Sequence, residues 1–179
     1  MKTIIQHTFI TFLFATALIS CDKVEEATNI TVNSNEKITL SFNLTGGVTI
    51  SESNTYDLST NSDISKYLDN LKGVNLKEAY YVISGFTGNS SETVTGSFSF
   101  TLANQPFGAF EHSFKDDFSS GKKTAFDEAK LNAVGTKLFE DKKMTVSLEG
   151  SHNIPSNSTV AETVTIDLHL QLEFTASPL

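Results

Sequence analysis

Long stretches of the chain alternate between apolar and polar residues, which is the period of a β-strand with one buried face. The longest stretch runs from Val164 to Phe174, where every second residue is valine, isoleucine, leucine or phenylalanine and polar residues lie between them. The same alternation covers residues 38–44, 94–102 and 144–148. Residues 79–86 are rich in tyrosine, valine and isoleucine and predict a further strand.

One apolar face and one polar face per strand are typical of antiparallel sheets packed on a single side, not of a parallel α/β sheet. We therefore predict a mainly β protein, an antiparallel β-sandwich of about seven or eight strands with two short helices. Gly46-Gly47 predicts a hairpin turn that joins strand 38–44 to a returning strand at residues 48–50, because glycine adopts positive φ at little cost.

Residues 107–118 fit two patterns. Phe107, Phe110, Phe114 and Phe118 form a helical stripe, and Pro106 would suit the first turn of that helix. Phe110, His112 and Phe114 fit the alternation of a strand equally well. We favour a strand that returns from residues 97–102 through residues 103–106, because the neighbouring segments are strands.

Two segments have helical spacing. In the first, Asn61 or Ser62 can cap a short helix whose apolar residues lie at i, i+3, i+4 and i+7, and Gly73 is placed to end it; those residues are Ile64, Tyr67, Leu68 and Leu71. The second runs from about residue 124 to residue 139, with Leu131, Val134 and Leu138 on one face. Asp127-Glu128 lies in its first turn, where the helix dipole favours acids.

The N-terminus carries a lysine at position 2 and an uncharged apolar run from Phe9 to Ile19, which is the length of a signal-peptide core and too short to span a bilayer. Leu18-Ile19-Ser20-Cys21 closes this run and resembles the lipobox of bacterial lipoproteins. The resemblance implies cleavage before Cys21 and a diacylglyceryl group on its sulfur. An ordinary secretory signal with an incidental cysteine is the alternative.

Cleavage before Cys21 would divide the chain into a signal peptide at residues 1–20, a polar tether at residues 21–29 and a single β-sandwich domain at residues 30–179. Cys21 is the one cysteine of the 179 residues, so disulfides and thiolate metal sites are excluded. The chain has 13 basic residues, all lysine, against 21 acidic ones, for a formal charge of −8. This acidic balance without arginine or tryptophan argues against nucleic acid and anionic lipid headgroups as partners.

Sequence motifs for nucleophilic, phosphate-binding or metal chemistry are absent, and we expect no cofactor and no enzymatic activity. The best cluster of candidate metal ligands is Glu111, His112, Asp116 and Asp117. These carboxylates and one imidazole suit a divalent cation, but the same residues suit a solvated turn. Adjacent Asp116 and Asp117 point in opposite directions on an extended chain, and we therefore assign no metal site.

The other candidates for chemistry are histidines and aromatic residues. We expect His152, in a loop at residues 150–155, and His169, on the polar face of the last strand, to be exposed and without a catalytic function. Tyr80-Tyr81 and the 14 phenylalanines can line a carbohydrate or apolar pocket, although packing in the core is the commoner use of phenylalanine.

Residues 57–74 and 79–86, in the order strand, short helix, tyrosine-rich strand, are similar to uncharacterised β-sandwich lipoproteins of Bacteroidetes. Strand 164–174 and the ending Thr-Ala-Ser-Pro-Leu179 share this similarity. In that group a lysine and acidic residues after the lipidated cysteine resemble a signal for export to the cell surface. Val24 interrupts that run here, so the resemblance leaves open which side of the outer membrane the protein faces.

We therefore expect a lipid-anchored envelope protein that acts as a non-catalytic binding, adhesion or structural module. Its expected partners are the membrane, through lipid on Cys21, and an envelope protein or a glycan, with no nucleic acid. A carrier of a small apolar ligand held between the sheets is the alternative. A hydrolase whose catalytic residues are dispersed along the sequence is a third hypothesis.

Overall fold

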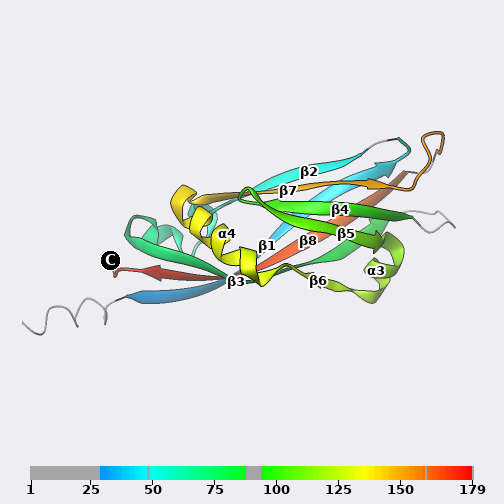
Figure 1. Cartoon of the computed structure of the whole chain (residues 1–179). Helices are drawn as coiled ribbons and strands as arrows, with labels where there is room; N and C mark the ends of the chain where they lie inside the picture. Colours follow the sequence, from blue (N-terminus) through cyan, green and yellow to red (C-terminus); the bar gives the residue numbers. More distant parts are fainter. Residues whose placement is uncertain (1–28, 48, 88–93, 160, 179) are drawn as a thin grey trace, which may run out of the picture.

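The protein folds into two four-stranded antiparallel sheets that pack face to face (Figure 1). The structure is a computed structural model that describes residues 29–47, 49–87, 94–159 and 161–178. Sheet A has the strand order β1-β8-β3-β6, and sheet B has the order β2-β7-β4-β5. The strands are β1 (Ile30–Thr45), β2 (Ile50–Asp57), β3 (Leu71–Thr87), β4 (Thr95–Leu102), β5 (Gln105–Ser113), β6 (Lys123–Ala125), β7 (Lys143–His152) and β8 (Ala161–Ala176).

Successive strands cross from one sheet to the other, except for the hairpin between β4 and β5. This connectivity is that of an eight-stranded jelly roll, a form of the antiparallel β-sandwich. The predicted fold class is therefore confirmed. The four long alternating stretches lie in β1, β4, β7 and β8, and their apolar residues face the opposite sheet.

The core lies between the two sheets and is rich in aromatic rings. Tyr81 is its centre, with ring centroids of Phe98, Phe100, Phe110 and Phe126 within 4.8–5.7 Å of its own. Packing of this kind accounts for the high phenylalanine content of the chain. The carrier hypothesis, which rested on these phenylalanines, therefore loses the observation that motivated it.

The hairpin predicted at Gly46-Gly47 is wrong. β1 pairs with β8 along its whole length, and β2 pairs with β7, so this turn connects the two sheets. Alternation shows which face of a strand is buried but not which strand lies beside it. A Cβ on Gly46 would lie 2.1 Å from the carbonyl oxygen of Pro155, and Gly47 has φ of +78°. Glycine is needed here for close packing and for positive φ.

The short helix predicted at residues 62–71 is present, but as the 3₁₀ helix η2 (Ser65–Asn70) and not as an α-helix that extends to Gly73. A second 3₁₀ helix, η1 (Leu58–Thr60), precedes it, and β3 begins at once with Leu71. Asn61 explains this geometry, because its buried side chain accepts hydrogen bonds from the backbone N–H groups of Asp63 and Ile64. Gly73 lies within β3 and does not end a helix.

Residues 107–113 belong to a strand and residues 114–118 to a helix, so each of the two patterns is correct for part of the segment. The favoured strand is confirmed as far as Ser113, and α3 (Phe114–Ser120) follows it. The β4–β5 turn consists of Ala103 and Asn104, both with positive φ. The second predicted helix is confirmed as α4 (Glu128–Asp141), which begins later than expected because residues 123–125 form β6 against β3. Asp127 caps α4 by accepting a hydrogen bond from the backbone N–H of Ala129.

The two ends of the sandwich differ. Ile30, where β1 begins, pairs with Ala176, where β8 ends, so both lie at one end, which also carries η2 (Figure 1). The β1–β2 and β7–β8 connections and α3 lie at the other end, which we call the loop end. Cys21 and the segments assigned as signal peptide and most of the tether lie outside the described residues. Within the described part of the chain, no helix is long and apolar enough to cross a membrane.

Candidate functional site

The four candidate metal ligands do not come together. His112 points into the core, whereas Glu111, its neighbour on β5, points to solvent. Asp116 accepts a hydrogen bond from Ser113, and Asp117 turns inward to His112. In the described ranges no group of three or more potential ligands is placed to hold a metal ion.

His112 instead lies at the centre of a buried hydrogen-bond chain. Its Nδ1 lies 2.7 Å from Oδ2 of Asp117, and its Nε2 lies 2.8 Å from the hydroxyl of Tyr81. Because the carboxylate only accepts, Nδ1–H donates to Asp117 and the tyrosine hydroxyl donates to Nε2. The ring of Phe98 stacks on the imidazole at 4.5 Å between centroids. All hydrogen-bonding atoms of the neutral imidazole are thus satisfied.

Burial prevents the hydrogen-bonded side chains of Tyr81, His112 and Asp117 from acting as a reaction centre. Tyr81 is 1% exposed and His112 5% exposed, so neither can reach a substrate in solution. Burial lowers the pKa of His112 below its ordinary value, outweighing the opposite effect of Asp117, and burial raises the pKa of the Tyr81 hydroxyl. The hydrogen bond between His112 and Asp117 holds α3 against the sandwich.

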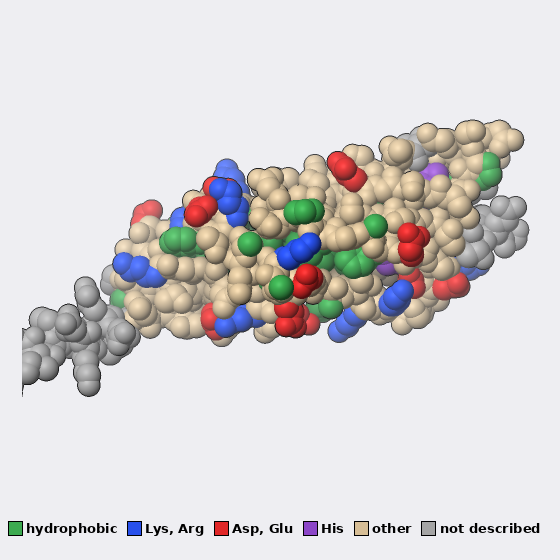
Figure 2. Space-filling view, viewed as in Figure 1, with side chains coloured by type: hydrophobic (Ala, Val, Ile, Leu, Met, Phe, Trp, Pro, Cys, Tyr) green, Lys and Arg blue, Asp and Glu red, His purple; other side chains and the backbone are tan. Residues whose placement is uncertain are grey.

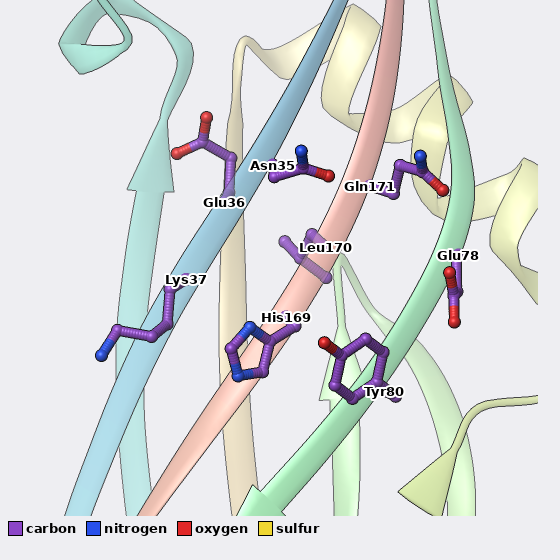
Figure 3. A pocket seen from close by; sticks show the side chains of 8 residues that line it. All are labelled: Asn35, Glu36, Lys37, Glu78, Tyr80, His169, Leu170 and Gln171. Atoms are coloured by element: carbon purple, nitrogen blue, oxygen red, sulfur yellow. The ribbon is translucent and has the colours of Figure 1, made fainter. Parts of the chain in front are cut away.

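A hollow of about 240 Å³ lies on the outer face of sheet A, across β1, β8 and β3 (Figure 3). It is lined by side chains and backbone of Asn35, Glu36, Lys37, Glu78, Tyr80, His169, Leu170 and Gln171. The rings of His169 and Tyr80 lie side by side in Figure 3, with Gln171 and Glu78 beside them. We call this the sheet A hollow.

A β-bulge in β3 determines which tyrosine faces the hollow. Leu76 pairs with Leu172, but Glu78 already pairs with Gln171, so Lys77 is the extra residue of the bulged strand. The extra residue reverses the inward and outward alternation after Leu76. Tyr80 therefore points outward and Tyr81 inward, and a regular strand would place them the other way round.

Tyr80 is held between neighbours from the strands on both sides. Its ring is stacked with His169 of β8 at 4.8 Å between centroids and an interplanar angle of 13°. Nζ of Lys123, on β6, lies 4.8 Å from the centroid of the same ring. These contacts leave the edge of the ring and the hydroxyl group for a ligand, and they do not leave an open face for stacking.

Lys37, which lines the hollow, is already engaged in an ion pair with Asp167. Nζ of Lys37 lies 3.2 Å from Oδ2 of Asp167, and Thr39 donates to Oδ1 of the same carboxylate at 2.6 Å. Burial raises the pKa of Asp167, but the bonds from Thr39 and Lys37 outweigh this effect and the net shift is downward. This carboxylate is thus engaged within the protein.

Three polar side chains of the hollow have no such partner. Asn35, Glu78 and Gln171 make no side-chain hydrogen bond within the described residues. Two amides and one carboxylate together offer both donors and acceptors. With the Tyr80 hydroxyl and the imidazole of His169, they can bind a polar ligand through several hydrogen bonds.

The sequence pointed to parts of this site only. Tyr80 and His169 were recognised, but Asn35, Glu78 and Gln171 were missed, although each occupies an outward position of a strand. His169 faces outward as predicted, and its stacking on Tyr80 was not foreseen. His152 lies at the end of β7, not in a loop, and its Nδ1 accepts a hydrogen bond from the backbone N–H of Ile154.

On the face of the molecule drawn in Figure 2, side chains of one type do not gather into a large patch. Charges of both signs are scattered there between neutral polar side chains and backbone. Within the described residues the large hydrophobic side chain that is exposed is Phe118, on α3. It belongs to the loop end and does not line the hollow.

No family model matches this chain. No curated protein matches it. Solved structures that resemble it include that of tobacco necrosis virus, at 10% identity and a TM-score of 0.46, covering 84% of this chain and 97% of that one. The structure of Desmodium yellow mottle tymovirus has 12% identity and a TM-score of 0.44, with 84% of each chain covered. Likenesses this weak say nothing about what the present chain does.

Proposed function

We propose that the protein is a lipid-anchored, non-catalytic binding module of the cell envelope, and that the sheet A hollow binds a glycan. The hollow is the observation that carries the proposal, because it brings three unengaged polar side chains and an aromatic pair together on a rigid sheet. Anchoring rests on the lipobox-like sequence at Cys21.

The polarity of the site favours a glycan over a protein partner. The centres of protein interfaces are rich in aromatic and apolar side chains and poor in charge. The hollow instead presents amides, a carboxylate, an imidazole and a phenol, and these groups match the hydroxyl groups of a sugar. Its volume of about 240 Å³ suits a single sugar unit.

The proposed anchor would leave the outer face of sheet A accessible. The described chain enters the sandwich at Ile30, beside Ala176. A tether at residues 21–29 would therefore hold the sandwich by this end and leave the outer face of sheet A open along its length. At about 3.3 Å per residue, the 16 residues of β8 extend roughly 50 Å from the tethered end.

Binding of the detergent-solubilised protein to immobilised bacterial envelope and host glycans tests the proposal. Asn35→Ala is expected to weaken binding about tenfold, since one lost hydrogen bond in a binding site costs about 1–1.5 kcal/mol. Asn33→Ala is the matched control, because Asn33 is also an exposed outward residue of β1 and does not line the hollow.

Tyr80→Ala removes the ring and the hydroxyl together and is expected to abolish binding while the protein stays folded, because Tyr80 lies outside the core. A protein that binds no glycan, or an Asn33→Ala variant as weak as Asn35→Ala, would contradict this assignment of the site.

A further inference from the structure

The carboxylates that border the sheet A hollow along β8 are neutralised by lysines. Asp167 and Glu173 lie on β8 on either side of the segment 169–171 that lines the hollow. Nζ of Lys37 lies 3.2 Å from Oδ2 of Asp167, and Nζ of Lys77 lies 2.9 Å from Oε1 of Glu173. These two ion pairs balance the negative charge at the borders of the hollow.

The two carboxylates that line the hollow are not neutralised in this way. Glu36 lies on β1 and Glu78 on β3, so they come from opposite sides of it (Figure 3). Within the described residues neither forms an ion pair with a lysine. Oε1 of Glu36 accepts hydrogen bonds from the side chains of Ser34 and Asn61, which are buried and neutral. These bonds fix the carboxylate in place and leave its charge uncompensated.

The basic groups near the hollow do not offset these two charges. The ammonium of Lys37 is balanced by Asp167. Lys123 belongs to β6, which lies on the side of β3 away from β8. Its Nζ lies 4.8 Å from the centroid of the Tyr80 ring, and the same ring is stacked on His169 of β8. The ring therefore separates this ammonium from the hollow, which keeps a net negative charge.

A net negative charge favours a ligand that carries a cation. A calcium ion would need about six or more oxygen ligands that converge on it at about 2.3–2.6 Å. In the part of the chain that the structure describes, no group of three or more potential ligands is placed to hold a metal ion. An ammonium group needs only one carboxylate, because it brings its own hydrogen-bond donors. The charge therefore favours an organic amine over a metal ion.

The other side chains of the hollow favour an amine that also carries hydroxyl groups. The amides of Asn35 and Gln171 each offer donors and an acceptor, which match sugar hydroxyls. The volume of about 240 Å³ suits a single sugar unit. A sugar with an unsubstituted amino group combines the positive charge with the hydroxyls. N-acetylation removes that charge, and a uronic acid brings a negative charge that Glu36 and Glu78 repel.

We propose that the hollow selects a sugar unit with a free amino group, and that Glu78 determines this specificity by accepting hydrogen bonds from the ammonium. Glu78 is exposed on β3, whereas Glu36 already accepts from Ser34 and Asn61 and adds to the attraction through its charge. The inference rests on the proposed glycan site and names the class of sugar that this site takes.

Titration of the whole protein in detergent, followed by ¹H–¹⁵N NMR, tests the preference. The probes are the methyl glycosides of glucosamine and galactosamine, their N-acetyl derivatives, and methyl glucuronide. We expect the tighter of the two amino sugars to bind about tenfold more tightly than its N-acetyl derivative, as one hydrogen bond between charged groups allows. Methyl glucuronide should bind more weakly than both. The advantage of the amino sugar should decrease as NaCl is raised from about 20 to about 300 mM, because exposed charges are screened.

Two substitutions and one further probe locate the specificity. Glu78→Gln keeps the size of the side chain and removes its charge, so it should abolish the preference and leave the affinity for the N-acetyl derivative within about twofold. Glu149→Gln is the matched control, because it removes the same charge from an exposed position on β7 of sheet B and should keep the preference. Butylamine has the amine without the sugar hydroxyls and should bind at least about tenfold more weakly than the amino sugar.

The outcomes separate this inference from the glycan site on which it rests. Amino sugars that bind no more tightly than their N-acetyl derivatives, or no more tightly than butylamine, overturn the inference. The glycan site still stands in that case if immobilised glycans bind the wild type more tightly than Asn35→Ala. If no glycan binds, the site and its preference fail together. A preference that persists in Glu78→Gln, or that is lost in Glu149→Gln, also refutes the assignment to Glu78.

Discussion

His112 shows how one buried side chain can serve structure in a position that looks reactive. It receives a hydrogen bond from Tyr81 and donates one to Asp117, which is the order of groups in a catalytic relay. Its surroundings decide the outcome, since the tyrosine hydroxyl at the end of the relay is sealed among phenylalanine rings. The sequence showed His112 beside acidic residues but not which way each would point.

The lowered pKa of His112 makes part of the stability depend on pH. The unfolded protein binds a proton at the ordinary histidine value near 6.5, and the folded protein does so at a lower pH. This contribution to stability is therefore fully present above about pH 6.5 and is lost as the pH falls through the folded-state pKa. We expect the Tm to decrease over that range.

The difference between wild type and His112→Gln isolates this residue, because glutamine can accept from Tyr81 and donate to Asp117 but does not titrate there. Thermal unfolding between pH 7.5 and pH 5 should show a shallower decrease for the variant. Equal slopes would assign the acid sensitivity to other groups.

At the scale of elements, alternation located the strands well, because each buried face leaves its period in the sequence. It does not show where a local irregularity changes the phase, as at the bulge of Lys77, which decides that Tyr80 faces the hollow. The same method placed a hairpin at Gly46-Gly47, since nothing local distinguishes a hairpin from a turn between sheets. Residues 62–71 were predicted as one short helix from their apolar spacing, because the bonds that join Asn61 to Ser34 and Glu36 do not show in that spacing.

The packing of α4 on β3 depends on Gly135. A Cβ at this position would lie 2.8 Å from the carbonyl oxygen of Val74 and 3.0 Å from the backbone nitrogen of Leu76. Gly135→Ala is therefore expected to lower the free energy of unfolding by about 1–3 kcal/mol, even though alanine favours helix. Denaturant unfolding measures this change.

Asn132→Ala is the control for α4, because it brings alanine to an exposed position of the same helix and should stabilise the protein slightly. A Gly135→Ala variant that is more stable than wild type would show that α4 does not pack so closely on β3.

At the scale of the molecule, the jelly-roll connectivity separates three regions. One end carries Ile30 and Ala176, the loop end carries Glu162 and His152, and the outer face of sheet A carries the hollow between them. The hollow combines residues from positions 35–37, 78–80 and 169–171, which the chain brings together only through long-range strand pairing. No local pattern could have predicted it.

In the proposed arrangement these regions have an order in space, with the tether at one end and the sheet A hollow held away from the membrane. That order depends on Cys21, which joins the sandwich through residues 22–29. Two or more acyl chains anchor a protein stably, because each buried CH₂ contributes about 0.8 kcal/mol. The domain then needs no membrane-binding surface of its own.

Intact mass spectrometry of the protein extracted from the membrane fraction of its native source tests this claim most directly. We predict a chain that begins at Cys21 and carries a diacylglyceryl group on that cysteine, usually with a third acyl chain on its amine. A membrane-derived chain that retains residues 1–20, or that carries an unmodified Cys21, would contradict the account.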